Sequence, residues 1–123
     1  MVTVKDRKGR EWRFFLSVGM GDDPEYMRLV GYCPELRLAG WGHANPQVRD
    51  LQTDEVHPGF VFEGPREKTG IAVQLTDDGY AEIVRHEAGH RSEEAAVVYG
   101  QTYGFHDTPE LPAAIEEMLW GKD

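Results

Sequence analysis

The sequence contains a single cysteine, Cys33, which excludes an intrachain disulfide and a zinc ribbon built from the cysteines of one chain. It also lacks any apolar run near the roughly 18 residues that can cross a bilayer. Its start, MVTVKDRKGREWRFF, has no apolar stretch of the signal-peptide kind. We therefore expect a cytoplasmic protein without a membrane partner, and we interpret Cys33 as a small buried hydrophobe.

Basic residues are scarce in the C-terminal part of the chain. The net charge is −9, and residues 77–123 hold three Lys or Arg against eleven Asp or Glu, whereas residues 1–40 hold seven against six. An acidic surface repels the phosphate backbone of nucleic acids. Direct nucleic-acid binding is therefore not expected, whereas a protein partner with a basic surface is compatible with the charge.

The length and composition favour one folded unit. The chain has 123 residues, of which 40% are apolar, and this is enough for one hydrophobic core. The sequence shows no internal repeat and no linker. We therefore expect residues 1–123 to form a single domain.

Alternating apolar residues predict strands in the N-terminal two-thirds. A hairpin is expected around the turn DRKG at 6–9, because apolar residues occupy every second position on both sides of it: Val2, Val4, Trp12, Phe14, Leu16 and Val18. A third strand is expected within residues 35–41. A second hairpin is expected from residues 60–64 and 71–75, which flank the turn PREKTG.

Two segments between these strands have less regular patterns. Residues 19–31 are interpreted as a short helix or turn, because Asp23-Pro24 is a good helix start and Gly31 a good stop, although MRLVGY at 27–32 also fits a strand. Residues 42–59 contain two prolines and two histidines without a clear period and are interpreted as a long loop.

Helical patterns follow residue 76. One helix is expected to begin near Gly79 after a cap at Thr76, Asp77 or Asp78, a second after Ser92, and a third from Thr108-Pro109-Glu110. The pattern leaves open whether the first helix continues through Gly89. The predicted fold class is α+β, with an antiparallel sheet of about four to five strands packed on one face by two or three C-terminal helices.

The segment IVRHEAGHRSEEAAV at 83–97 contains two histidines four residues apart, His86 and His90, with Glu87 between them. On a helix, residues at this spacing lie on the same face about one turn apart, so both imidazoles can reach one tetrahedral metal ion. A zinc site of this kind needs a third protein ligand and an open position for water.

Residues 83–90 resemble the active helix of the zincin metallopeptidases, in which two apolar residues and a variable residue precede His-Glu-x-Gly-His. The resemblance implies that His86 and His90 are zinc ligands and that Glu87 is the general base of a hydrolase. It also requires a third ligand, for which Glu117 and His106 are the candidates. The alternative interpretation places both histidines on a solvated helix end, because the polar segment Arg91-Ser92-Glu93-Glu94 follows them.

Two functions are therefore carried forward. The first is a small acidic interaction or inhibitor domain that binds a basic protein partner and needs no cofactor. In size and composition it is similar to inhibitors encoded by phages and accessory genomes. Its expected partner-binding residues are the C-terminal carboxylates Glu82, Glu93, Glu94, Glu116 and Glu117. The alternative is a zinc-dependent hydrolase that uses Glu87 with His86 and His90.

Further histidines lie within residues 42–59. His43 and His57, with Asp50, Asp54 and Glu55, have residue types that suit a small metal or acid–base site. We interpret these histidines as solvated loop residues.

Overall fold

The computed structural model describes residues 2–18, 27–65, 67, 69–90 and 113–120. These residues form the strands β1 (Val2–Lys5), β2 (Glu11–Val18), β3 (Met27–Cys33), β4 (Leu38–Arg49), β5 (Val56–Gly64) and β6 (Ala72–Gln74), and the helices α1 (Asp77–His90) and α3 (Ala113–Trp120). The coarse prediction of an α+β fold with an antiparallel sheet is confirmed. The sheet has six strands, more than the four to five expected.

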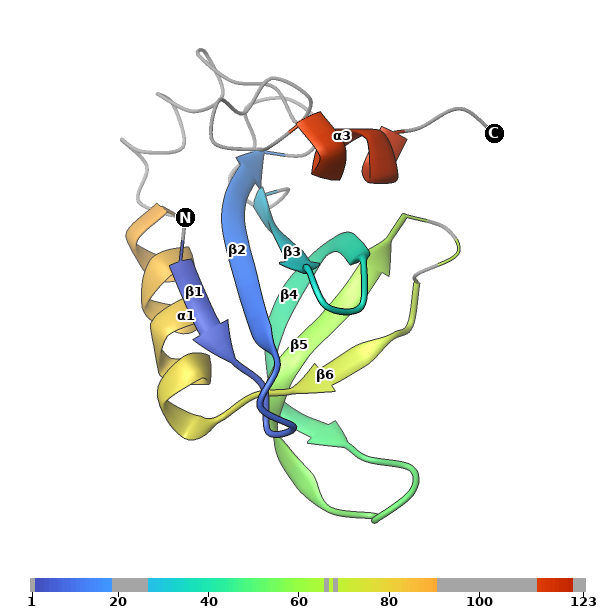
Figure 1. The fold of residues 1–123 in the computed structure, drawn as a ribbon. Helices are drawn as coiled ribbons and strands as arrows, with labels where there is room; N and C mark the ends of the chain where they lie inside the picture. The colour runs from blue at the N-terminus through green and yellow to red at the C-terminus, as the bar shows by residue number, and fades with distance from the viewer. Residues whose placement is uncertain (1, 19–26, 66, 68, 91–112, 121–123) are drawn as a thin grey trace.

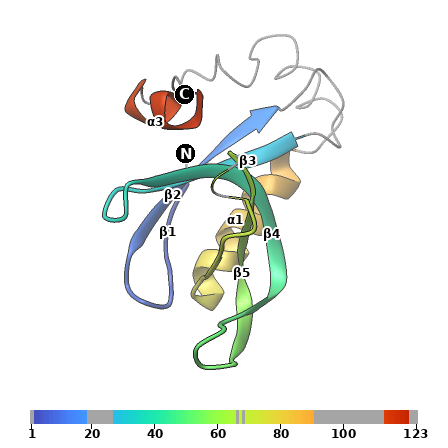
Figure 2. The same ribbon diagram turned by 90° about the vertical axis from the view of Figure 1, so that its right-hand side faces the viewer.

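The strands form a meander in which each strand pairs with the next one along the chain, in the order β1-β2-β3-β4-β5-β6 (Figure 1). Every pairing is antiparallel. A bridge between Asp6 and Leu75 also brings the end of β6 to the end of β1. The sheet therefore curls until its first and last strands meet at one end, and Figure 2 shows this curvature.

Both predicted hairpins are present. In the first, Val4 pairs with Trp12 and Val2 with Phe14, and Gly9 in the connecting turn has a φ of 85°. Glycine suits this turn because L side chains rarely adopt a positive φ. In the second hairpin, Phe60 of β5 pairs with Val73 of β6.

The expectation of a helix or turn over residues 19–31 is wrong where it can be compared, because β3 begins at Met27. Residues 19–26 lie outside the described residues. Leu29 and Val30 are both fully buried, although neighbouring residues of a strand point to opposite faces. A strand buried on both faces has a continuous apolar run instead of an alternating one, and this hides the period of two.

The expectation of a long loop over residues 42–59 is also wrong. β4 continues to Arg49 and β5 begins at Val56, so that only six residues, 50–55, connect the two strands. Pro46 and Pro58 lie in an irregular stretch of the pairing, where the register shifts between Asn45 and Val48. Bulges of this kind accommodate proline, which has no backbone N–H to donate to the hydrogen bonds between strands.

Hydrophobic cores lie on both faces of the sheet. The first core contains Val4, Trp12, Phe14, Leu29, Cys33, Phe60, Phe62, Val73, Leu75 and Ile83 of α1. The second contains Phe15, Val30, Ala39, and Ile115 and Leu119 of α3. The expectation that the helices cover one face is therefore wrong, because the apolar side chains of Phe15 and Val30 make the second face a packing surface as well.

Helix α1 begins where the sequence predicts, and it continues through Gly89, which the sequence pattern left open. The Oγ1 of Thr76 accepts a hydrogen bond from the backbone N–H of Gly79 at 3.0 Å, the geometry of an N-cap. The helix passes through Gly89 and reaches His90.

None of the described helices is long and apolar enough to cross a membrane. The expected second helix after Ser92 lies outside the described residues, as does the expected start of the third at Thr108.

Candidate functional site

Helix α1 carries the residues that resemble a zinc helix, and its orientation follows from its apolar positions. Ile83 is fully buried in the first core, and Tyr80 is partly buried against the same core. Val84 and Arg85 lie on the exposed side. Residues three, four and seven positions after Ile83 share its side of a helix, so the positions of His86, Glu87 and His90 follow the buried stripe.

His86 and Glu87 are half-buried. The helix end is therefore not fully exposed at these two residues, whereas Ala88 is exposed. The backbone of α1 is helical from His86 to His90, which gives the one-turn spacing that the resemblance requires. The side chain of His90 lies outside the part of the chain whose side chains are described.

The two candidate third ligands have different positions. Glu117 is exposed on α3, which packs against the second core, whereas α1 packs against the first. Figure 1 shows the two helices apart, so the structure does not bring Glu117 beside His86. His106 lies outside the described residues. Within residues 2–18, 27–65, 67, 69–90 and 113–120, no three His, Cys, Asp or Glu side chains form a group that could hold a metal ion.

The expected partner-binding carboxylates are divided between the two helices. Glu82 lies on α1, where it forms an ion pair with Arg85 across one turn. Glu116 and Glu117 lie on α3. Glu93 and Glu94 lie outside the described residues. The structure therefore does not gather Glu82 and Glu117 into one continuous patch.

The histidines between residues 42 and 59 lie on strands and not in a loop. The Nδ1 of His43 on β4 lies 3.0 Å from Glu63 Oε1 on β5, and the Nε2 of His57 lies 3.4 Å from Glu55 Oε2. His43 pairs in register with Val61, whereas His57 pairs with Val48 beyond the bulge. The two histidines therefore contact different carboxylates and do not share one centre.

Asp50 and Asp54 have local partners. Asp50 Oδ1 accepts hydrogen bonds from the backbone N–H groups of Gln52 and Thr53, at 2.8 and 3.3 Å. Asp54 Oδ1 lies 2.6 Å from Arg49 Nη1. Both carboxylates stabilise the β4–β5 connection.

The most buried ionisable group that the sequence reasoning missed is Asp6, in the β1–β2 turn. Its side chain accepts four hydrogen bonds: from the backbone N–H of Lys8 at 2.9 Å, the backbone N–H of Arg10 at 2.8 Å, Arg10 Nε at 2.7 Å and Trp12 Nε1 at 2.8 Å. Burial acts to raise the pKa of Asp6, but the hydrogen bonds from Trp12 and Arg10 and the charge of Arg10 outweigh it and lower the pKa. The aspartate that begins the DRKG turn is the local signal for this arrangement.

Comparison of the chain with protein-family models, with curated proteins and with solved structures finds no match in any of the three.

Proposed function

We propose that this chain is a non-catalytic interaction domain that binds a basic protein surface through acidic helical residues, in the manner of a small inhibitor. The supporting observation is the charge of the two described helices. α1 contains four carboxylates and α3 two, and Arg85 is the one Lys or Arg in these two segments. Asp77, Asp78 and Glu117 are exposed.

The arrangement of these charges suits a recognition role. Asp77 and Asp78 occupy the first turn of α1, where carboxylates interact favourably with the helix dipole, so they are compatible with a stable helix. Their side chains remain accessible, since the Asp77 side chain is 86% exposed even with Arg7 Nη1 at 4.0 Å. Carboxylates of this kind speed association with a cationic partner and favour it over anionic ones.

A decalysine peptide is a suitable probe for this surface. We expect it to bind the protein at low ionic strength, and we expect the affinity to fall steeply as salt is added, because exposed charges are screened. Asp78→Lys combined with Glu82→Lys is expected to weaken binding about tenfold or more, as is Glu93→Lys combined with Glu94→Lys. Isothermal titration calorimetry at two salt concentrations measures both effects.

The control is Glu11→Lys combined with Glu35→Lys, which makes the same change of charge at exposed positions of β2 and of the β3–β4 turn. Binding of decalysine to this control is expected to stay within about threefold of the wild type. Equal weakening in the control and in the helix variants would mean that the peptide senses only net charge, and the proposal would then be wrong.

A second candidate function, a zinc-dependent hydrolase, is supported by the continuity of α1 through Gly89. His86 and His90 would hold the ion with a third ligand, for which His106 remains a candidate, whereas Glu117 lies on α3, which packs on the other face of the sheet. Zinc bound at such a site acidifies a water molecule and polarises a carbonyl group. Glu87, next to His86 on the same side of the helix, would accept a proton as general base.

Metal analysis separates the two candidates. If the site binds zinc, protein purified without chelator should contain close to one zinc per chain, and His86→Ala should lose it while His57→Ala should not. Glu87→Gln should keep the metal and lose hydrolysis of a general peptide substrate. Metal-free protein whose melting temperature does not rise with added zinc would exclude this candidate and leave the interaction domain.

A further inference from the structure

A cleft of about 470 Å³ lies at the end of the sheet where β6 returns to β1. Its walls come from the β1–β2 turn, the β3–β4 turn, the end of β4 with the following loop, and β6 with the residues before it. This volume lies within the range of about 300–1,000 Å³ that is usual for small-molecule sites. No residue predicted as functional from the sequence, other than Asp50, lines it.

Hydrogen bonds fix the walls of the cleft. The backbone N–H of Arg7 donates to Gln74 O at 3.0 Å, which joins the β1–β2 turn to β6. The Nε2 of Gln74 donates to Val48 O at 2.8 Å and to Glu55 O at 3.0 Å, which joins β6 to both ends of the β4–β5 connection. The residues on the N-terminal side of Gln74, from Gly70 to Val73, line the cleft together with this turn. These hydrogen bonds therefore fix three of the segments that surround the cleft.

Exposed apolar side chains gather at this cleft. Among the described residues, five large hydrophobic side chains are exposed, and three of them, Leu36, Leu51 and Ile71, line the cleft. Leu51 is 92% exposed. The buried side chains of Trp12 and Val73 also contribute to the lining. Exposed apolar side chains that converge on one concavity are typical of a binding site.

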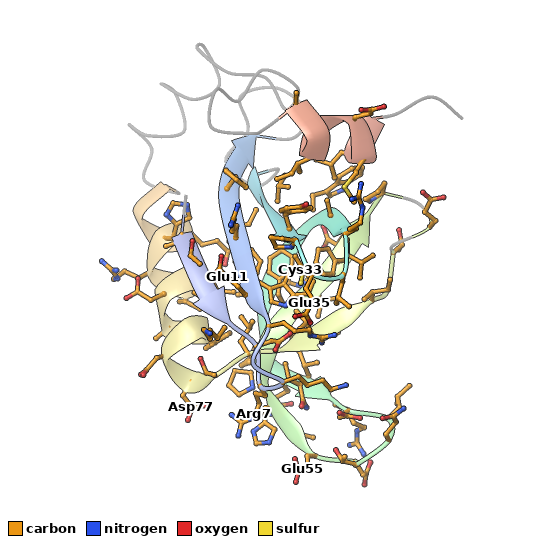
Figure 3. All side chains as sticks on the ribbon, in the orientation of Figure 1. Arg7, Glu11, Cys33, Glu35, Glu55 and Asp77 are labelled. Atoms are coloured by element: carbon orange, nitrogen blue, oxygen red, sulfur yellow. The ribbon has the colours of Figure 1, made fainter. Side chains whose placement is uncertain are left out.

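The charge of the lining is opposite to that of the chain. Four cationic residues line the cleft, Arg7, Lys8, Arg10 and Arg49, together with two carboxylates, Asp6 and Asp50. The lining therefore has a net charge of +2, in a chain of net charge −9. The region around Arg7, next to Asp77 at the start of α1, can be followed in Figure 3.

The two carboxylates of the lining are engaged by the protein itself. Both oxygens of Asp6 accept hydrogen bonds from its own turn and from Trp12, and Asp50 Oδ1 accepts from two backbone N–H groups. Arg10 is engaged by Asp6, and Arg49 by Asp54. Lys8 is exposed, and the pKa of Asp50 is lowered first by the hydrogen bond from the backbone of Gln52 and further by the positive charge of Lys8. The nearest carboxylate to Arg7 among the described residues is that of Asp77, at 4.0 Å. Lys8 and Arg7 are therefore the cations best placed to meet an anion from solution.

We propose that this cleft binds a small organic anion, a molecule with an apolar body and one carboxylate, phosphate or sulfonate group. The apolar body would contact Leu36, Leu51 and Ile71, and the anionic group would pair with Lys8 and Arg7. A peptide strand fits the site less well, because β6 offers an edge of only three residues, Ala72–Gln74, and Gln74 O already accepts from Arg7. The lining shares no residue with α1 or α3, although Arg7 lies 4.0 Å from Asp77 at the start of α1.

The test uses two fluorescent probes that differ by one sulfonate, 8-anilinonaphthalene-1-sulfonate and the neutral N-phenyl-1-naphthylamine. The sulfonate is expected to bind folded protein at least about fivefold more tightly than the neutral probe, with one site per chain. Lys8→Glu and Arg7→Glu should each weaken sulfonate binding about fivefold and leave the neutral probe within about twofold. Leu51→Ser should weaken both probes.

The matched control is Arg85→Glu, the same change of charge on the exposed side of α1. It should leave both probes within about twofold of the wild type, and circular dichroism confirms that every variant is folded. Equal binding of the two probes, or equal weakening by Arg85→Glu and Lys8→Glu, would overturn the proposal. A labelled acidic decapeptide that binds more tightly than the sulfonate and displaces it would assign the cleft to a peptide instead.

Discussion

At the scale of single residues, Asp6 combines local hydrogen bonds with a backbone bridge to a distant strand. It is 2% exposed, and its four hydrogen-bond donors come from within its own hairpin. Its burial depends on the meeting of β1 and β6, because Asp6 bridges to Leu75. The backbone of Asp6 therefore links the first turn of the sheet to the closing strand, while its carboxylate stabilises the turn itself.

Replacing Asp6 tests this role. Asp6→Asn keeps the shape but puts an N–H₂ group where an acceptor faces Arg10 and Trp12, so we expect a loss of about 2–3 kcal/mol of unfolding free energy at pH 7. Guanidinium unfolding followed by tryptophan fluorescence measures this loss. Asp78→Asn, an exposed change of the same kind on α1, should cost less than about 1 kcal/mol.

The same variant gives a prediction about pH. Because the pKa of Asp6 is lowered in the folded state, its ionised form stabilises the fold above the unfolded-state pKa, near 3.9, and that stabilisation is lost as the pH falls through the lower folded-state value. The difference in unfolding free energy between wild type and Asp6→Asn should therefore be largest near pH 7 and shrink below about pH 4. A difference that stays constant from pH 7 to pH 3 would contradict this account.

The role of a single residue could be predicted from the sequence where it depends on residues close by in the chain. The N-cap Thr76 was among the predicted candidates, because capping involves residues within one helical turn. Cys33 is buried as expected for a small apolar residue. The burial of Asp6 was missed because Asp6 bridges to Leu75, a residue far along the chain, although its hydrogen-bond donors are local. The basic lining of the cleft was missed because its residues come from the β1–β2 turn and from β4.

At the scale of elements, the strands predicted from the sequence are those with a visible alternation of apolar residues. β1, β2 and β6 show this alternation, although Phe14 and Phe15 of β2 are buried on opposite faces, whereas β3 has a continuous apolar run and β4 and β5 are irregular at Pro46 and Pro58. Both features depend on which strands become neighbours and on what covers them. The pattern of residues 27–33 and 42–59 therefore did not predict their structure.

Gly42 of β4 lies where a side chain would clash with the backbone of β5. A Cβ atom added to Gly42 would lie 1.9 Å from Val61 O of β5, next to the register shift between Trp41 and Gly42. The contact is with backbone, which cannot move aside as a flexible side chain can. Close approach of the two strands therefore requires glycine at this position.

We predict that Gly42→Ala costs at least about 3 kcal/mol of unfolding free energy, or prevents folding, because the two strands must separate to admit the methyl group. Gln47→Ala, at an exposed position of the same strand, should stay within about 0.5 kcal/mol of the wild type. Denaturant unfolding of the two variants gives the comparison. A fully stable Gly42→Ala protein would show that β4 and β5 are further apart than the structure places them.

At the scale of the whole molecule, charge and apolar surface have a polarised arrangement. The described helices are strongly acidic, whereas the cleft where β6 meets β1 has a lining of net charge +2. A cationic macromolecule is attracted to the first region and a small anion to the second. The two proposed binding sites therefore favour ligands of opposite charge, and variants at one site serve as controls for the other.

The two cores share the central strands, and this has a consequence for unfolding. Phe14 and Phe15 are neighbours on β2 that belong to different cores, as are Leu29 and Val30 on β3. If β2 or β3 leaves the sheet, both cores lose buried side chains, so one core cannot unfold without the other. We therefore predict one cooperative unfolding transition, in which far-ultraviolet and near-ultraviolet circular dichroism change together.

Core substitutions on the two faces test this prediction. Ile83→Ala on α1 and Ile115→Ala on α3 each remove a fully or nearly fully buried side chain, so each should cost about 2–5 kcal/mol and lower the midpoint of the same transition. Val84→Ala and Glu117→Ala, on exposed positions of the same helices, should change the midpoint little. If Ile115→Ala instead produced an early, separate transition while the first core stayed folded, the sheet would not couple its two faces, and α3 would have to be regarded as a detachable element.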